Sequence, residues 1–241
     1  MKSLGSITKY YSFVDPGTRI MLENQMDAAT NYKDFVRCFC GAVVDDESHD
    51  ERVYLAARLA LHYGGANTMP RLVKRYPSSV LARPYYLLHL RHTHGDMPML
   101  RIAESIREAL QANPAEWIHL DLLLRLWQCH NIWKDVPVLR ELRRRMRDLI
   151  EANLQLECFI PGIYHVMMQG KRESEQDESI NDVLKIARKY DDQVAIARLF
   201  ALNASFIKST DLDLAKKCFH FARELDEDLG LDPKGVYSLS I

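Results

Sequence analysis

Hydrophobic residues recur every three or four positions along most of this chain, the spacing that places them on one face of an α-helix. Polar caps, glycines and prolines divide the pattern into separate segments. No segment shows the sustained alternation of apolar and polar residues that is typical of a strand. The pattern therefore predicts an all-α protein of about twelve helices joined mostly by short loops.

Start signals mark the helices of the first third of the chain. Asp15, followed by a proline, is expected to be an N-cap with proline at the first helical position. Ser48 and Glu51 have the spacing of a capping box. We expect divergent helices over residues 15–77, after an N-terminal extension at residues 1–14 that lacks a helical stripe.

The middle of the chain carries the most hydrophobic predicted helix. Before it, Pro84 is expected to open a helix that stops at Gly95, and Asp96 to cap the next one. Asn113-Pro114-Ala115-Glu116 then combines an N-cap, a proline and a capping-box glutamate. The helix that follows is apolar on almost every side, so we expect it to be buried on most sides. Its apolar residues are Trp117, Ile118, Leu120, Leu122, Leu123, Leu124, Leu126 and Trp127.

The remaining segments continue the helical pattern. We expect an arginine-rich amphipathic helix over residues 135–154 and an apolar helix over residues 156–169. Residues 170–177 (GKRESEQD) predict an exposed loop, and residues 178–190 another helix. A tail follows at residues 231–241.

Residues 199–230 predict two helices that meet at a polar turn. In the second helix the small residues Ala215 and Ala222 flank Phe219, which suits close packing of two antiparallel helices. This stretch resembles one repeat of the tetratricopeptide (TPR) type. A large apolar residue three positions before an alanine recurs along the chain, at Ile106/Ala109, Leu149/Ala152, Leu184/Ala187 and Phe219/Ala222.

The resemblance extends loosely over residues 84–229. The four alanines are about 43, 35 and 35 residues apart, against a period of 34 in tetratricopeptide repeats. Two consensus positions differ, because Asn203 replaces a glycine and Glu227 replaces a proline. The resemblance implies a single domain, residues 1–241, folded as a right-handed α-solenoid of antiparallel helix pairs.

A binding groove is the main functional expectation from this resemblance. Scaffolds of the family bind a partner's extended or helical segment on the concave face, which their first helices line. The resemblance assigns four apolar residues to that face: Ala197, Phe200, Ala204 and Ile207. An apolar patch exposed to water marks an interaction site. A partner protein or the chain's own tail would cover it, unless neighbouring helices already bury it.

An arginine-rich helix supplies the alternative of nucleic-acid binding. Arg140, Arg144 and Arg147 share one helical face, which could contact phosphates or an acidic partner. The other interpretation is a solvated face balanced by nearby acids. Aromatic side chains for base stacking are not interleaved with these arginines, so the nucleic-acid alternative is the less favoured one.

Three histidines supply the alternative of a metal-dependent enzyme. His89, His92 and His94 have a spacing that could hold a metal ion, with Asp96 as a weak fourth ligand. The competing interpretation is a polar helix end whose histidines are solvated. The sequence has no phosphate-binding glycine loop, no Gly-x-Ser-x-Gly and no His-Glu-x-x-His. We therefore expect no enzymatic activity and no cofactor.

The composition limits the cellular compartments and the classes of binding partner that we expect. A net charge of −1 gives no overall attraction to nucleic acid or to an anionic membrane. Five scattered cysteines favour a reducing compartment without disulfides. The most apolar stretch, residues 118–127, is too short to span a bilayer and contains Asp121 and Arg125. We expect a cytoplasmic scaffold, adaptor or regulatory subunit that binds another protein, with homo-oligomer formation left open.

Overall fold

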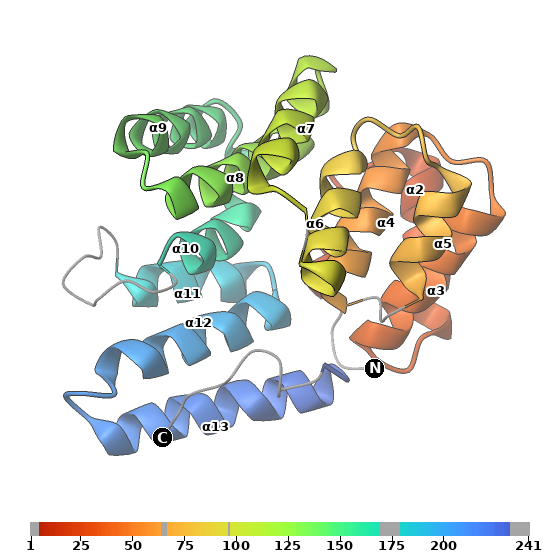
Figure 1. Cartoon of the computed structure of the whole chain (residues 1–241). Helices are drawn as coiled ribbons and strands as arrows, with labels where there is room; N and C mark the ends of the chain where they lie inside the picture. The colour runs from red at the N-terminus through yellow and green to blue at the C-terminus, as the bar shows by residue number, and fades with distance from the viewer. Residues whose placement is uncertain (1–4, 64–66, 96, 169–178, 232–241) are drawn as a thin grey trace. The chain divides into compact units, whose positions relative to one another are not determined.

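The computed structural model describes residues 5–63, 67–95, 97–168 and 179–231. These residues form helices and no strand, which confirms the all-α prediction. Twelve of the α-helices in the described ranges have eight residues or more, in agreement with the number that the pattern predicts. Consecutive helices pack against each other as in an α-solenoid (Figure 1).

The chain forms two compact units. The N-terminal unit comprises residues 13–29 and 33–154. Within it, α4 packs on α5 and α6, α7 packs on α6 and α8, and α9 packs on α8. Its helices are α2 (Pro16–Ala28), α3 (Tyr32–Asp45), α4 (Asp50–Tyr63), α5 (Thr68–Arg75), α6 (Arg83–His94), α7 (Met99–Gln111), α8 (Glu116–Trp133) and α9 (Val136–Ala152).

The C-terminal unit comprises the described residues of 1–12, 30–32 and 155–241. Within it, α10, α11 and α12 contact one another, and α12 and α13 form a long antiparallel pair (Figure 1). Its helices are α1 (Gly5–Thr8), the 3₁₀ helix η1 (Leu154–Phe159), α10 (Ile160–Met168), α11 (Ile180–Lys189), α12 (Gln193–Ile207) and α13 (Leu212–Asp228).

Several predicted start and stop signals act as expected. The Asp15 side chain accepts a hydrogen bond from the Thr18 backbone N–H at 3.0 Å, and α2 begins at Pro16. Burial would raise the pKa of Asp15, but hydrogen bonds from Thr18 and His49 lower it to about 2. Gly95, at φ 78°, ends α6 in the left-handed conformation that glycine adopts most easily.

Other start signals were wrong in detail. Ser48 is not the cap of α4, because its hydroxyl donates to the Val43 carbonyl oxygen at 3.5 Å and the helix begins at Asp50. Asn113 adopts a left-handed φ of 51°, which keeps it and the following proline outside α8. Ala115 therefore occupies the N-cap position of α8. The expected cap of α7, Asp96, lies outside the described residues, as do residues 170–177 and 232–241.

The predicted helix at residues 156–169 divides into two elements. Residues up to Phe159 form η1, and α10 begins at Ile160. Pro161 therefore stands in the first turn of α10, where its missing N–H breaks no helical hydrogen bond. The proline starts a new helix instead of bending a continuous one.

The prediction that the most hydrophobic helix is buried on most sides is confirmed. Residues of α8 are buried around its whole circumference from Trp117 to Trp127. The buried set includes Asp121 and Arg125, two charged residues within the apolar run. Neighbouring helices must therefore supply both apolar contacts and polar partners to α8.

The first residues of the chain complete the C-terminal unit. α1 packs against α12, with the Ile7 side chain fully buried. The Lys9 ammonium pairs with the buried Asp192 carboxylate, which also caps α12 by accepting from the Ala195 N–H at 3.0 Å. The ring of Tyr10 lies 5.7 Å from that of Phe159. The extension therefore docks through apolar, ionic and aromatic contacts together.

Substitution at Ile7 tests this docking. Replacing a fully buried isoleucine with alanine removes apolar contacts and leaves a cavity, so we expect a loss of about 2–4 kcal/mol in the C-terminal unit. Hydrogen–deuterium exchange should then speed up in α12. Ile20, 57% exposed on α2, is a matched control, and Ile20→Ala should leave α12 unchanged. Equal effects of the two variants would contradict the docked position of Ile7.

Candidate binding surface

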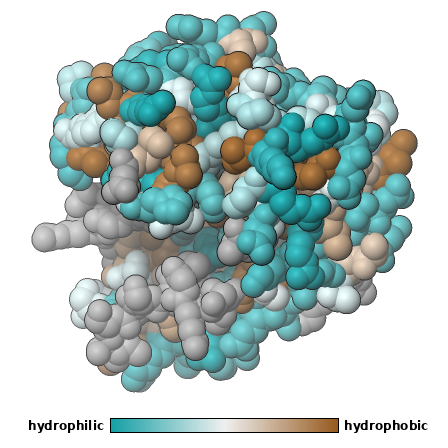
Figure 2. All heavy atoms as spheres, turned by 45° about the vertical axis from the view of Figure 1, so that its right-hand side comes forward, coloured by the Kyte–Doolittle hydropathy of each residue, from teal (hydrophilic) through white to brown (hydrophobic). Residues whose placement is uncertain are grey.

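Three large apolar side chains are exposed together at the turn between α8 and α9. Ile132 and Val136 are each 57% exposed, and Trp133 is 40% exposed. We call these three residues the α8–α9 surface. Figure 2 shows one face of the molecule, on which hydrophobic residues form small separate patches among hydrophilic residues. Clusters of exposed aromatic and aliphatic side chains of this kind mark interaction sites.

A tight turn fixes the α8–α9 surface. α8 ends at Trp133, and the Lys134 N–H donates to the Asn131 carbonyl oxygen at 3.3 Å. Asp135 then caps α9 by accepting from the Val138 N–H at 3.4 Å. Because both helix ends are capped within three residues, the apolar side chains project from rigid backbone.

Lys134 adopts an unfavourable backbone conformation at this turn. Its φ of 57° and ψ of 34° are left-handed. Among the described non-glycine residues with positive φ, Asn113 and Asp191 belong to types that tolerate this region, whereas lysine does not. Such strain costs of order 1–3 kcal/mol and clusters at functional sites. The strained backbone at a cationic residue makes this turn a candidate for binding.

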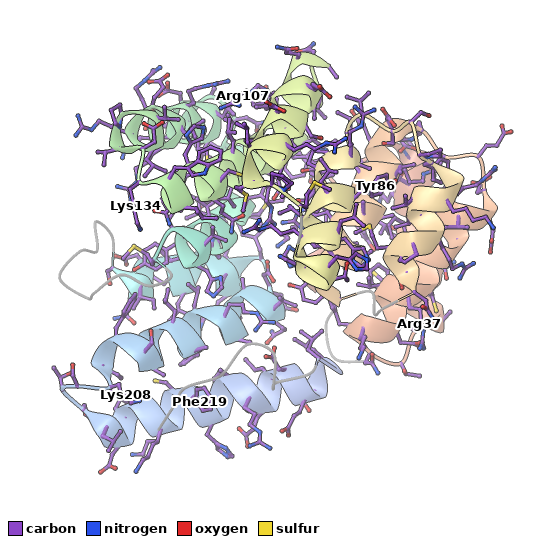
Figure 3. All side chains as sticks on the ribbon, viewed as in Figure 1. Arg37, Tyr86, Arg107, Lys134, Lys208 and Phe219 are labelled. Carbon is purple, nitrogen blue, oxygen red and sulfur yellow. The ribbon has the colours of Figure 1, made fainter. Side chains whose placement is uncertain are left out.

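The charges next to the α8–α9 surface are mostly positive. The His130 ring meets the Trp133 ring edge-on, at a centroid distance of 4.9 Å. His130 also bonds to the Arg107 guanidinium at 3.1 Å and to the Asp135 carboxylate at 3.3 Å. Figure 3 shows Arg107 on α7 and Lys134 at the end of α8. Two cations against one acid give the edge of the surface a positive balance.

Reasoning from the sequence missed this surface. The signal was present, because apolar residues continue at Ile132 and Trp133 up to the polar pair Lys134-Asp135. Periodicity does not show where the neighbouring helices stop covering α8, so the end of the helix was not separated from its buried part.

The predicted groove face of α12 packs against α13. Ala197 and Ala204 are buried, and Ala204 packs with Ala215 of α13. Phe200 and Ile207 are half-buried, and the Phe200 ring lies 4.7 Å from that of Phe221. In Figure 3, Phe219 lies on α13, from where it contacts the same cluster. Side chains of α13 therefore cover part of this face, and its use as a binding groove stays a prediction.

The arginines of α9 form a solvated face. Arg140, Arg144 and Arg147 are all exposed, as the predicted stripe requires. Arg144 pairs with the Glu141 carboxylate at 2.8 Å and with the Asp148 carboxylate at 2.7 Å. These pairs neutralise the centre of the stripe and weaken its attraction for phosphates. Surface pairs of this kind contribute little to stability.

The three histidines do not form a metal site with other described residues. His89 is half-buried at the end of α6, whereas His92 and His94 are exposed. Burial and the nearby His92 and His94 lower the pKa of His89. In the described ranges, no group of three or more His, Cys, Asp or Glu side chains is arranged to hold a metal ion.

Comparison with known proteins gives no assignment. No family model matches the chain, and no curated protein or solved structure matches it. All five cysteines are free, which confirms the prediction of no disulfides. No helix in the described part of the chain combines the length and hydrophobicity needed to cross a membrane.

Charged substitutions test the position of the α12 face. Phe200→Asp with Ile207→Asp would place two carboxylates against α13, so we expect the C-terminal unit to lose about 3 kcal/mol or more. Faster hydrogen exchange in α13 would report this loss. The control is Ser205→Asp, at an exposed position of the same helix. A stable double variant with normal exchange would show that this face is not part of the core.

Proposed function

We propose that the chain is a TPR-like helical-repeat scaffold that binds a segment of a partner protein at the α8–α9 surface. The exposure of Ile132, Trp133 and Val136 on a single rigid turn carries the proposal. Tryptophan is among the residue types enriched at the energetic centres of protein interfaces. Capped helix ends hold the three side chains in place before binding, which reduces the entropy lost on association.

The proposed partner segment carries an apolar anchor flanked by acidic residues. The anchor would cover Trp133 and Ile132. Its carboxylates would pair with Lys134 and Arg107, which border the surface. This partner differs from the one expected for a groove on α12, because the site lies at a helix turn.

The TPR-like part of the proposal rests on sequence spacing together with helix packing. The 35-residue intervals between Ala152, Ala187 and Ala222 lie close to the family's period of 34. In the structure, consecutive helices pack as neighbouring pairs, of which α8 with α9 and α12 with α13 are the most extensive. A cytoplasmic location belongs to the same proposal, supported by the five free cysteines.

Site-specific crosslinking tests the proposed function. A photoreactive amino acid at Val136 should crosslink one partner protein in cells of the native source, and peptide mapping should place the crosslink in an acidic segment with an apolar anchor. Trp133→Ala should weaken binding of that synthetic segment at least tenfold, because interface tryptophans often contribute 2 kcal/mol or more. Ile20→Ala, which removes an apolar side chain that is more exposed than Trp133, 57% against 40%, is the control. Equal crosslinking from positions 20 and 136 would contradict the proposal.

Lys134→Gly separates binding from stability. Glycine adopts the left-handed conformation without steric cost, so this variant should unfold at the same or a higher denaturant concentration, with a gain of up to about 1 kcal/mol. It should nevertheless bind the crosslinked segment more weakly, since one cation is lost. If affinity is unchanged at low salt, Lys134 has no part in binding.

A further inference from the structure

An apolar stripe runs along one side of α13 in the C-terminal unit. Leu214, Phe221 and Leu225 share one face of the helix, because their spacing is close to whole turns. Leu214 is 46% exposed, Phe221 is 41% exposed and Leu225 is half-buried. The half-buried Phe200 of α12 extends this face, since its ring centroid lies 4.7 Å from that of Phe221. We call these four residues the α13 stripe.

The α13 stripe is an apolar surface with a polar border. Lys217 and Glu224, the neighbouring positions along one edge, are both exposed. Among the described helices, α12 is the one on which α13 packs most extensively, and it leaves Leu214 and Phe221 open to water. Large apolar side chains exposed side by side and bordered by charges are the arrangement of a docking surface.

The end of α13 reverses the chain. The Leu231 N–H donates to the Asp226 carbonyl oxygen at 2.8 Å, and the Gly230 N–H donates to the Glu227 carbonyl oxygen at 3.0 Å. With Gly230 at a left-handed φ of 69°, these two bonds form a Schellman motif. A Cβ at this glycine would lie 2.6 Å from Asn31 Cγ, so a larger residue would clash. The chain therefore leaves α13 along a fixed path.

The last described residue, Leu231, leads the chain to the α13 stripe. Its side chain is buried at 7% exposure. In Schellman motifs the residue after the glycine commonly makes an apolar contact with the last turn of the helix. The apolar residue at that position in α13 is Leu225, which belongs to the stripe. Residues 232–241 thus start at one end of the surface that they would cover.

Residues 232–241, which lie outside the described residues, have a suitable length and composition. Ten extended residues span about 33 Å, whereas Leu225 and Leu214 are about 17 Å apart along the helix axis. Tyr237, Leu239 and Ile241 alternate with serines, so an extended segment places all three on one side. This run is too short to predict a strand of a sheet, but it matches a single apolar stripe.

We propose that residues 232–241 dock across the α13 stripe as an internal cover, with Tyr237 and Leu239 against Phe221. The covalent link gives the segment an effective concentration of about millimolar, so modest affinity is sufficient for docking. Because Phe200 belongs both to the stripe and to the predicted groove face of α12, a partner could use that face only after displacing the segment. The α8–α9 surface is a separate site, and this proposal does not depend on it.

Photocrosslinking in the full-length protein tests the docking. A photoreactive amino acid is placed at Tyr237, and peptide mapping identifies the residues to which it attaches. We expect attachment to residues 214–225 or to Phe200. An equal mixture of protein labelled with ¹⁴N and with ¹⁵N should give attachment within one molecule and not between molecules. No attachment, attachment to another part of the chain or attachment to a second copy would each overturn the proposal.

Phe221→Asp removes the apolar surface at its centre. A carboxylate among apolar side chains should lower the crosslinking yield by about tenfold, which corresponds to about 1.4 kcal/mol. Leu212→Asp is the matched control, because Leu212 is 47% exposed on the opposite side of the same helix. It should keep the yield. Equal yields from the two variants would contradict the docked position.

A reciprocal probe gives an answer that does not depend on how well Phe221→Asp folds. A photoreactive amino acid at Leu214 replaces an exposed side chain and adds no charge. It should attach to residues 236–241 of the same molecule. Attachment only to other segments would overturn the proposal.

Discussion

The N-terminal unit depends on the burial of α8, a helix with almost no face for water. Apolar side chains cover its circumference, so neighbouring helices must enclose it on several sides. Asp121 adds a stricter condition, because a buried carboxylate is tolerated only with hydrogen bonds and counter-charges. Tyr54 of α4 and Tyr85 of α6 supply these hydrogen bonds from positions distant in sequence. The polar contacts therefore fix how α4, α6 and α8 meet.

The α8–α9 surface lies where this enclosure of α8 is incomplete. Ile132 and Trp133, about two turns after the buried Arg125, are exposed beyond the helices that cover the rest of α8. One helix therefore combines a structural core with an end on which a partner would replace missing protein contacts.

Local signals in the sequence were sufficient for much of the helical structure. The Asp15 cap, the end of α6 at Gly95 and the burial of α8 follow from capping signals and periodicity. These local signals do not show which neighbouring helix, if any, covers a given helix face. The family resemblance assigned Ala197 and Ala204 to one face of α12, but only tertiary packing shows that both are buried and that Ala204 packs against α13. Likewise, the sequence shows Asp121 and Arg125 only as two charged residues within an apolar stretch. Their interaction partners on other helices are visible only in the structure.

The docking of the first residues on the C-terminal unit has a consequence for synthesis on the ribosome. Lys9 and Asp192 are separated by 183 positions. At about 5–20 residues per second, Lys9 would wait roughly 10–35 seconds for its partner to be translated. During that interval Ile7 and Tyr10 lack their final contacts, whereas most helices of the N-terminal unit are already complete. The C-terminal unit can therefore reach its native packing only late in translation, and nascent chains would need the N-terminal segment kept accessible until then.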